Sequence, residues 1–155
     1  MIVVRALRED EREWVRSTIR ERWGSEIVVA HGVAYEPAGL PGFVAEDEDS
    51  PIGLLTYVLE GETCEIVTID ALEEGRGVGT SLIGAVKELG ARRLWLITTN
   101  DNVRAQRFYE RLGFTLVAVH EGAVDRSRLE KPEIPLLGHG GVEIHDELEY
   151  GLRQE

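Results

Sequence analysis

The sequence predicts a mixed fold of the α/β (α+β) type, with a central, mostly antiparallel sheet flanked by helices. Three β-rich runs, at residues 42–46, 52–59 and 63–71, follow one another across short turns and predict an antiparallel meander. From residue 63 onward the elements alternate as strand, helix, strand, helix, strand, which predicts right-handed crossovers. The 155 residues are enough for one hydrophobic core, and we expect a single domain over residues 1–155.

The N-terminal part begins with a strand and a helix. Residues 2–7 are apolar and β-branched, and Arg8 to Asp10 opens a helix whose apolar residues recur at helical spacing up to Trp23 and Gly24. Residues 27–30 form either a short strand or an extended loop. The segment 31–41 is rich in proline and glycine, and we expect it to be irregular.

The second half supplies two helices, each ended by a glycine. Val78 to Leu89 places apolar residues on one face and stops at Gly90, and Val103 to Leu112 stops at Gly113. Beyond residue 120 the pattern is weaker. Strands are expected at residues 93–99, 114–119 and 142–152.

Composition and charge limit the kind of partner. The 17 basic and 29 acidic residues give a net charge of −12, which disfavours nucleic acid and favours a cationic ligand. The sequence has no apolar run long enough to span a membrane and no signal-peptide pattern, so we expect a cytoplasmic protein. The single cysteine, Cys64, excludes an internal disulfide.

A glycine-rich stretch joins the strand at residues 63–71 to the following helix. Gly75, Gly77 and Gly79 lie at every second position, so the chain can turn tightly and expose the unpaired N–H groups of a helix N-terminus to an anion. The dinucleotide fingerprint and the P-loop both require spacings that this stretch lacks. It therefore predicts a different kind of phosphate site, with Arg76 beside it.

The helix after residue 102 carries a second group of residues. At about 100° per residue, Asn102 and Tyr109 share a flank of the helix at the edge of its apolar stripe. A tyrosine on that flank has a buried ring and a hydroxyl that faces a cleft, which suits a general acid. Aromatic packing against the sheet is the structural alternative.

Together the two segments resemble the GNAT acyltransferase superfamily. The first is similar to its Arg/Gln-x-x-Gly-x-Gly/Ala pyrophosphate loop, and the second, Asn102 to Phe114, to its Asn-x-x-Ala-x-x-Phe-Tyr…Gly-Phe segment. The resemblance covers roughly residues 43 to 119. One departure is Glu74, which stands where the family usually has Arg or Gln; either it points to solvent or Arg76 takes over part of the contact.

This resemblance implies a sheet splayed between two parallel strands, with acyl-CoA lying in the opening. It implies direct transfer of the acyl group, most often to an amine, with acetyl-CoA as the donor. Main-chain groups of the strand before the loop would pair with the pantetheine, and the loop would hold the pyrophosphate. The cofactor-binding positions implied are Ile69, Ala71, Arg76, Gly77, Val78, Gly79, Thr80, Asn102 and Arg104.

The same resemblance implies the catalytic residues. Tyr109 would protonate the departing thiolate, and Glu65 matches the position at which some members carry a base. Asp70 is the alternative base, although strand alternation puts it on the opposite face from Glu65. Water is the third possibility for the proton of the amine. Less specific readings are Cys64 as an acylated nucleophile and a metal at His139 and His145.

The acceptor is the least determined part of the hypothesis. We expect a small-molecule or peptide amine, bound between residues 31–41 and the C-terminal third, with no resident metal and no nucleic-acid or membrane partner. The sequence leaves open whether two chains form a homodimer through the last strand. The alternative function is a non-catalytic acyl-CoA-binding module in which the acid and the base do not act.

Overall fold

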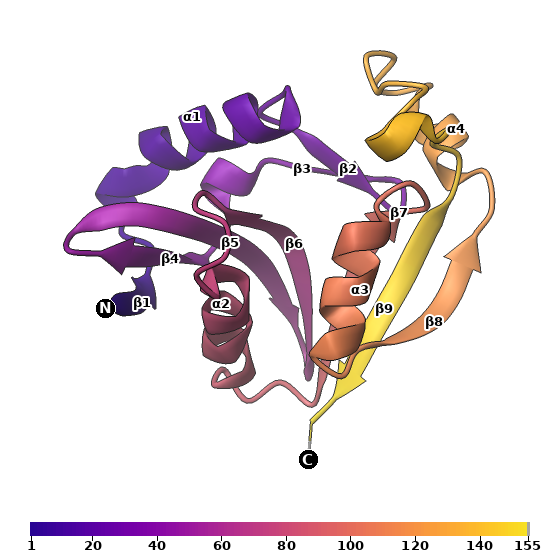
Figure 1. The fold of residues 1–155 in the computed structure, drawn as a ribbon. Coiled ribbons are helices and arrows are strands. Elements are labelled where there is room, and N and C mark those ends of the chain that lie inside the picture. The colour runs from indigo at the N-terminus through magenta and orange to yellow at the C-terminus, as the bar shows by residue number, and fades with distance from the viewer. Residues whose placement is uncertain (155) are drawn as a thin grey trace.

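A seven-stranded mixed sheet forms the centre of the computed structural model, which describes residues 1–154; position 155, the end of the predicted domain, lies outside them. Helix α1 and the β2–β3 hairpin lie on one side of the sheet, and α2 and α3 on the other (Figure 1). In spatial order the strands are β1 (Ile2–Ala6), β4 (Gly42–Asp47), β5 (Ser50–Glu60), β6 (Thr63–Ala71), β7 (Arg93–Thr99), β9 (Glu147–Arg153) and β8 (Thr115–His120).

Within residues 1–154, four helices and a separate hairpin complete the architecture. The helices are α1 (Arg12–Trp23), α2 (Val78–Lys87), α3 (Val103–Arg111) and α4 (Ala123–Ser127), and the hairpin pairs β2 (Val28–Ala30) with β3 (Val33–Tyr35). Short 3-10 turns lie at Glu9–Glu11, Pro37–Gly39 and His139–Gly141. No helix within residues 1–154 combines the length and apolarity needed to cross a bilayer.

The predicted elements agree with this arrangement except in the last third and in residues 31–41. The expected irregular segment contains β3, and α4 follows β8 where no helix was predicted. The expected strand at 142–152 is wrong at its beginning, because β9 starts at Glu147 and the chain before it turns through His139–Gly141. Strand β9 then inserts antiparallel between β7 and β8, so these two strands are not neighbours.

The parallel pair of strands opens along its length. Strands β6 and β7 pair only where Thr63 to Ile66 face Arg93 to Leu96, and beyond Ile66 they diverge. The edge of β6 from Val67 to Ala71 therefore has no strand partner on the side of β7. The splayed sheet is confirmed.

Two apolar clusters hold the layers together. On one face Val15 and Ile19 of α1 pack on Leu54 of β5. On the other face α2 and α3 cover the larger cluster, in which Leu82 and Leu94 are fully buried. The opening between β6 and β7 thus has α1 on one side and the N-terminus of α2 on the other (Figure 1).

An irregularity in β6 changes which way its side chains point. The register with β5 shifts between Thr56 and Tyr57, so that Val67 is an extra residue in β6. Glu65 faces Val58 and Asp70 faces Leu54, and because these partners are four apart on β5, the two acids share the α1 face. The expectation from simple alternation, that Asp70 and Glu65 lie on opposite faces, is wrong.

Candidate active site

A cleft of ≈ 580 Å³ begins at the splay of β6 and β7 and runs along the N-terminus of α2. Its walls come from β6, the loop before α2, the first turn of α2, and α3. Ile69 and Ala71 approach it from the α2 side of β6 and Asp70 from the α1 side, so the cleft reaches both faces of that strand. The predicted positions that line it are Ile69, Ala71, Gly77, Val78, Gly79, Thr80, Asn102, Arg104 and Tyr109.

The loop before α2 has the conformation that its glycines permit. Gly75 and Gly77 adopt left-handed backbone angles, with φ of 77° and 72°, and Gly77 is the N-cap of α2. The N–H groups of the first helical turn have no carbonyl partner within a helix, and they face the cleft from its end. This end of α2 favours an anion, because its N–H groups and the helix dipole act together.

Gly79 has a different role, because its backbone is ordinary helix. A Cβ at this position would lie 2.8 Å from Cζ of Phe108, a distance that real Cβ atoms do not tolerate. The absent side chain thus lets α3 pack directly on the first turn of α2. Asn102 caps α3 in turn, its side-chain oxygen accepting a hydrogen bond from the N–H of Ala105 at 3.2 Å.

The charged residues of the loop are arranged differently from the prediction. Arg76 does not line the cleft; its guanidinium donates to Glu73 at 2.9 Å and to Asp47, the last residue of β4, at 2.7 Å. Glu74 lines the cleft mouth, is 72% exposed, and forms an ion pair with Arg104 at 3.3 Å. The sequence left open whether Glu74 points to solvent or Arg76 takes over part of the contact with the phosphate. In the structure the Glu74 side chain is largely exposed to solvent.

Tyr109 lies at the inner end of the cleft with its ring buried against Phe108, Phe114 and Tyr150. Within residues 1–154 its hydroxyl has no hydrogen-bond partner. Burial, and then the nearby charge of Asp70, raise the pKa of the Tyr109 hydroxyl above its ordinary value. The hydroxyl therefore stays protonated and can donate a proton.

Asp70 is the carboxylate of β6 that lines the same cleft as Tyr109. The Trp23 indole donates to it at 3.0 and 3.2 Å, and the Arg22 guanidinium lies 4.0 Å away. Burial raises the pKa of Asp70, while the bond from Trp23 and the charge of Arg22 act in the opposite direction. A carboxylate with a raised pKa next to a neutral phenol is a common arrangement for proton transfer.

Glu65 is not brought into the cleft. It is buried on the α1 face, where it accepts a hydrogen bond from the Tyr35 hydroxyl at 2.6 Å and lies 2.8 Å from Nε2 of His31. Both carboxylate oxygens are therefore occupied by the β2–β3 hairpin. His31 has a left-handed backbone with φ of 42°, unusual for a residue with a side chain, so these contacts hold a strained turn in place.

Sequence reasoning missed two residues that line the cleft, Arg111 and Arg22. Arg111 lies seven residues after Arg104 on α3, a spacing that places both on one helical face and is visible in the sequence. Arg22 donates to the carbonyl of Ala71 at 2.9 Å, so one of the predicted pantetheine contacts is occupied here. Neither Arg22 nor Trp23 has a local signal, because α1 reaches the cleft through tertiary packing alone.

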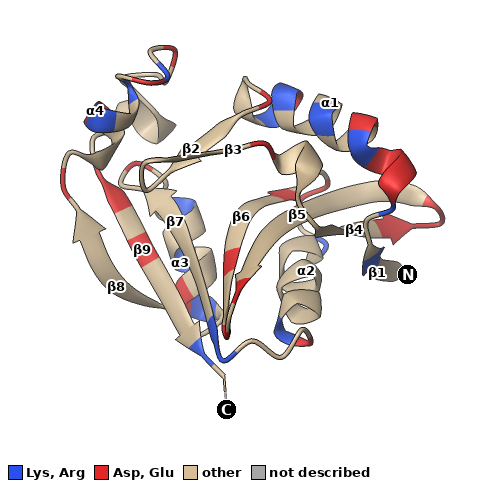
Figure 2. Ribbon diagram, turned by 180° about the vertical axis from the view of Figure 1, so that it is seen from behind, with Lys and Arg blue, Asp and Glu red and all other residues tan. Residues whose placement is uncertain are grey.

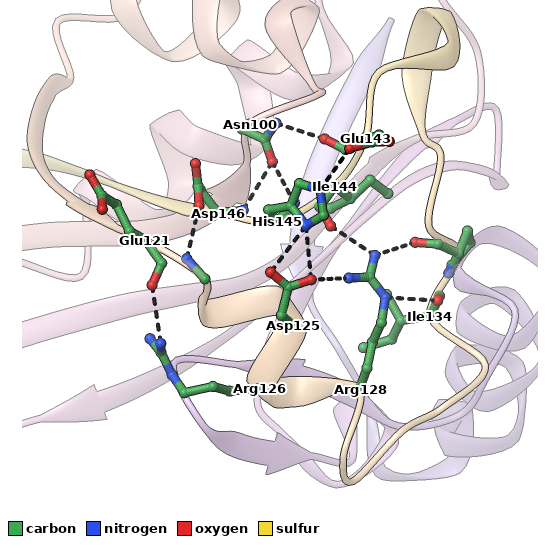
Figure 3. A network of polar contacts seen from close by, with 12 residues as sticks. Asn100, Glu121, Asp125, Arg126, Arg128, Ile134, Glu143, Ile144, His145 and Asp146 are labelled. Atoms are coloured by element: carbon green, nitrogen blue, oxygen red, sulfur yellow. Dashed lines mark hydrogen bonds and ion pairs between the residues drawn. The ribbon is translucent and has the colours of Figure 1, made fainter.

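The two less specific readings find little support among the described residues. Cys64 is fully buried, and burial raises the pKa of its thiol to about 11, so it is not a thiolate nucleophile. Both ring nitrogens of His145 have hydrogen-bond partners: Nδ1 lies 2.8 Å from Asp125 and Nε2 lies 2.9 Å from Glu143 (Figure 3). Within residues 1–154 no group of three potential ligands has the arrangement of a metal site.

The network in Figure 3 holds the segment between β8 and β9 in place. Arg128 donates to the carbonyls of Ile134, Pro135 and Ile144 at 3.2, 2.6 and 2.8 Å, and to Asp125 at 2.8 Å. The side chain of Asn100 ties the same segment to the end of β7. We call Asp125, Arg128 and His145 the clasp.

The fold and the cleft define a class of protein: a mixed α/β domain whose splayed sheet and helix N-terminus accept an extended ligand that carries phosphate. The sequence model of the acetyltransferase (GNAT) family matches residues 5–114, and the chain belongs to this family.

Relatives and solved structures agree with this family. The chain is 36% identical over 143 residues to the uncharacterized protein YxbD of Bacillus subtilis (strain 168), covering 88% of this chain and 89% of YxbD. It is 35% identical over 154 residues to the uncharacterized protein YdhI of the same organism, covering 96% of each. Its fold is similar to that of the IAA acetyltransferase from Bacillus cereus ATCC 14579, with a TM-score of 0.73, 18% identity and coverage of 99% and 100%.

Two similar structures contain the coenzyme. One is a Bacillus subtilis acetyltransferase in complex with CoA, with a TM-score of 0.70, 18% identity and full coverage of both chains (100%). The other is a GNAT family acetyltransferase from Elizabethkingia anophelis with acetyl-CoA bound, with a TM-score of 0.67, 15% identity and coverage of 99% and 98%. At these identities the likeness concerns the fold.

Proposed function

We propose that this protein transfers an acetyl group from acetyl-CoA to a primary amine. Three observations support the proposal: the family, the cleft at the N-terminus of α2, and the presence of both Asp70 and Tyr109 in the lining of that cleft. The last observation carries the enzymatic part, because a binding module has no use for a buried acid and base in one cleft.

The main chain provides most of the donor site in this proposal. The N–H groups of Gly77 to Thr80 bind the diphosphate, with Arg104 and Arg111 near it. The free edge of β6 from Val67 to Ala71 pairs with the pantetheine as an additional strand does. Arg22 moves off the carbonyl of Ala71 if that group is used. Asn102 keeps its capping role and contributes its amide to the wall of the cleft.

The chemistry is a direct transfer. The amine nitrogen attacks the thioester carbonyl carbon, the carbon–sulfur bond breaks, and the sulfur takes the proton of the Tyr109 hydroxyl. The attacking amine gives its proton to Asp70, which replaces Glu65 as our candidate for the base because it alone of the two lines the cleft. Solvent then removes the proton from Asp70 and returns one to the Tyr109 phenolate. Glu65 acts as a positioning residue for His31.

The test combines binding and turnover. Calorimetry should show that CoA and acetyl-CoA bind, and a panel of primary amines should accelerate the release of free CoA thiol. If acetyl-CoA binds but no amine accelerates thiol release, the non-catalytic module is correct. If neither CoA nor acetyl-CoA binds, both functions are excluded.

A further inference from the structure

Glu147, at the start of β9, is a buried carboxylate without a cation. It is 3% exposed, and the main-chain N–H of His31 donates to its two oxygens at 3.1 and 3.2 Å. Within residues 1–154, no Lys, Arg or His side chain lies within 4.0 Å of it. Burying an ionised carboxylate without a counter-ion is costly, so an anion held this way favours a cationic ligand.

Glu147 lines a cavity on the α1 side of the sheet. This cavity, of ≈ 310 Å³, lies between the end of α1, β2 and the segment held by the clasp, and we call it the acceptor cavity. Most of its wall is apolar: Val28, Val29, Val124, Ile134, Pro135 and Ile144. Lys131 and Glu133 also line it, but the ammonium of Lys131 donates to the carbonyl of Ile27 at 2.7 Å.

Trp23 lies between the acceptor cavity and the donor cleft. The Trp23 side chain lines the cavity and donates to Asp70, which lines the cleft. Asp70 stands on β6, and Glu147 faces Thr99 across the β7–β9 pair, so β7 lies between the two strands that carry these carboxylates. Acidic positions on both β6 and β9 are visible from this side of the sheet in Figure 2.

Basic groups near Glu147 act only at longer range. His31, His120 and Arg126 favour its charged form, but burial outweighs them and raises the pKa of Glu147. Arg126 is directed elsewhere, its guanidinium donating to the carbonyl of Glu121 at 3.1 Å. The carboxylate is thus left for a ligand that brings its own positive charge.

We propose that the acceptor is an aliphatic diamine and that Glu147 binds the protonated amino group that is not acetylated. This inference rests on the proposed function and adds the substrate class to it. The reacting amino group lies at Asp70 and the thioester, the hydrocarbon chain lies along the apolar wall, and the second amino group reaches Glu147. The net charge of −12 favours the approach of such a dication.

The test compares cadaverine with pentylamine, which differ only in the second amino group. For the wild type, KM for cadaverine should be lower by about 10- to 100-fold, the range expected for a hydrogen-bonded charge pair. The Glu147→Gln variant keeps an acceptor for the His31 N–H; it should lose this preference through KM for cadaverine, with kcat and the affinity for acetyl-CoA unchanged. Glu133→Gln, at the exposed rim of the same cavity, is the matched control and should keep the preference.

The possible results separate this inference from the proposed function. If the wild type acetylates both amines with equal KM, or if Glu147→Gln affects both amines alike, Glu147 does not select a diamine and the inference is overturned while the transferase remains. If other amines are acetylated and cadaverine is not, it is overturned as well. If acetyl-CoA binds but no amine releases thiol, the transferase itself is excluded.

Discussion

The indole of Trp23 donates a hydrogen bond to the carboxylate of Asp70 at 3.0 Å, joining the last residue of α1 to the strand that opens the sheet. The two residues are 47 positions apart in the chain. This bond links the carboxylate, which lines the donor cleft, to a residue that lines the acceptor cavity. It also favours the ionised form of Asp70, opposing the effect of burial.

The pH dependence of the reaction follows from this pair. Asp70 must be ionised to accept a proton, and burial raises its pKa, so kcat/KM should fall as the pH drops through that raised value. Trp23→Phe removes the hydrogen bond that favours the charged form, so the acid limb should move to higher pH. Asp70→Asn should remove the limb and lower the rate by about 10²- to 10⁴-fold. An acid limb that survives in Asp70→Asn rules out Asp70 as the base.

Replacement of Tyr109 tests the acid. Tyr109→Phe keeps the buried ring among Phe108, Phe114 and Tyr150 and removes only the hydroxyl. We expect kcat to fall by about ten- to a thousandfold, with the dissociation constant of acetyl-CoA unchanged in calorimetry. Tyr150→Phe, whose hydroxyl donates to Glu110 at 3.1 Å outside the cleft lining, is the control and should keep its activity. Equal activity of Tyr109→Phe and the wild type removes the hydroxyl from the mechanism.

Gly79→Ala tests the contact between α2 and α3. The added methyl group would lie 2.8 Å from Cζ of Phe108, so the Phe108 ring or the helix that carries it and Tyr109 must shift. We expect a destabilisation of about 1–3 kcal/mol, typical of overpacking, with weaker binding of acetyl-CoA. Gly84→Ala is the matched control in the same helix: nothing lies within 4 Å of its Cβ, so it should stabilise the protein by up to ~1 kcal/mol. Thermal melting of the two variants in opposite directions is the expected result.

Replacement of Glu74 tests the effect of a carboxylate at a position where the family usually has Arg or Gln. Its carboxylate pairs with Arg104 at the mouth of the cleft and holds that cation away from an incoming diphosphate. Glu74→Gln should bind CoA about two- to fivefold more tightly, the scale of an exposed ion pair, and the gain should shrink at high salt. Glu62→Gln, which removes an exposed carboxylate paired with Arg92 far from the loop, should leave CoA binding unchanged. Weaker binding by Glu74→Gln would mean that the carboxylate orders the loop.

The clasp predicts how stability depends on pH. Hydrogen bonds to Glu143 and Asp125 raise the pKa of His145 in the folded protein. The contribution of the protonated imidazole to the free energy of unfolding is therefore fully present below the pKa of the unfolded chain, about 6.5, and is lost as the pH rises through the pKa of the folded protein. The free energy of unfolding should therefore decline above about pH 6.5, and this decline should be weaker in His145→Gln. His139→Gln changes a histidine whose main chain, not its ring, is bonded to Asp101, and should leave the decline as it is. Denaturant titrations across this pH range provide the measurement.

Much of the donor side could be predicted because its signals are local. Alternating glycines before Val78, and Asn102 with Tyr109 on one helical flank, depend on spacings within a single element, and the structure places all of these residues around the cleft. The position of Arg76 could not be predicted in this way, because its partner Asp47 lies at the end of β4, 29 residues away in the chain. The Arg76 guanidinium pairs with Asp47 and Glu73 and does not line the cleft.

The face of β6 on which Asp70 lies depends on one residue of register. The extra residue Val67 reverses the alternation of β6, so Asp70 joins Glu65 on the α1 face, which a count along the sequence cannot show. The start of β9 could not be predicted for a similar reason. Residues from Val142 onward alternate as a strand does, yet the pairing with β7 begins only at Glu147, because the preceding residues are bonded to Asn100 and the clasp.

The two halves of the sheet meet along one short seam, where Thr63 to Ile66 lie beside Arg93 to Leu96. A coenzyme bonded along the free edge of β6 lengthens that seam and becomes a structural component of the molecule. Saturation with it should slow proteolytic digestion, because binding to the native state alone lowers the population of opened forms. If acetyl-CoA binds in this way, its supply in a cell should also affect how fast this protein is degraded.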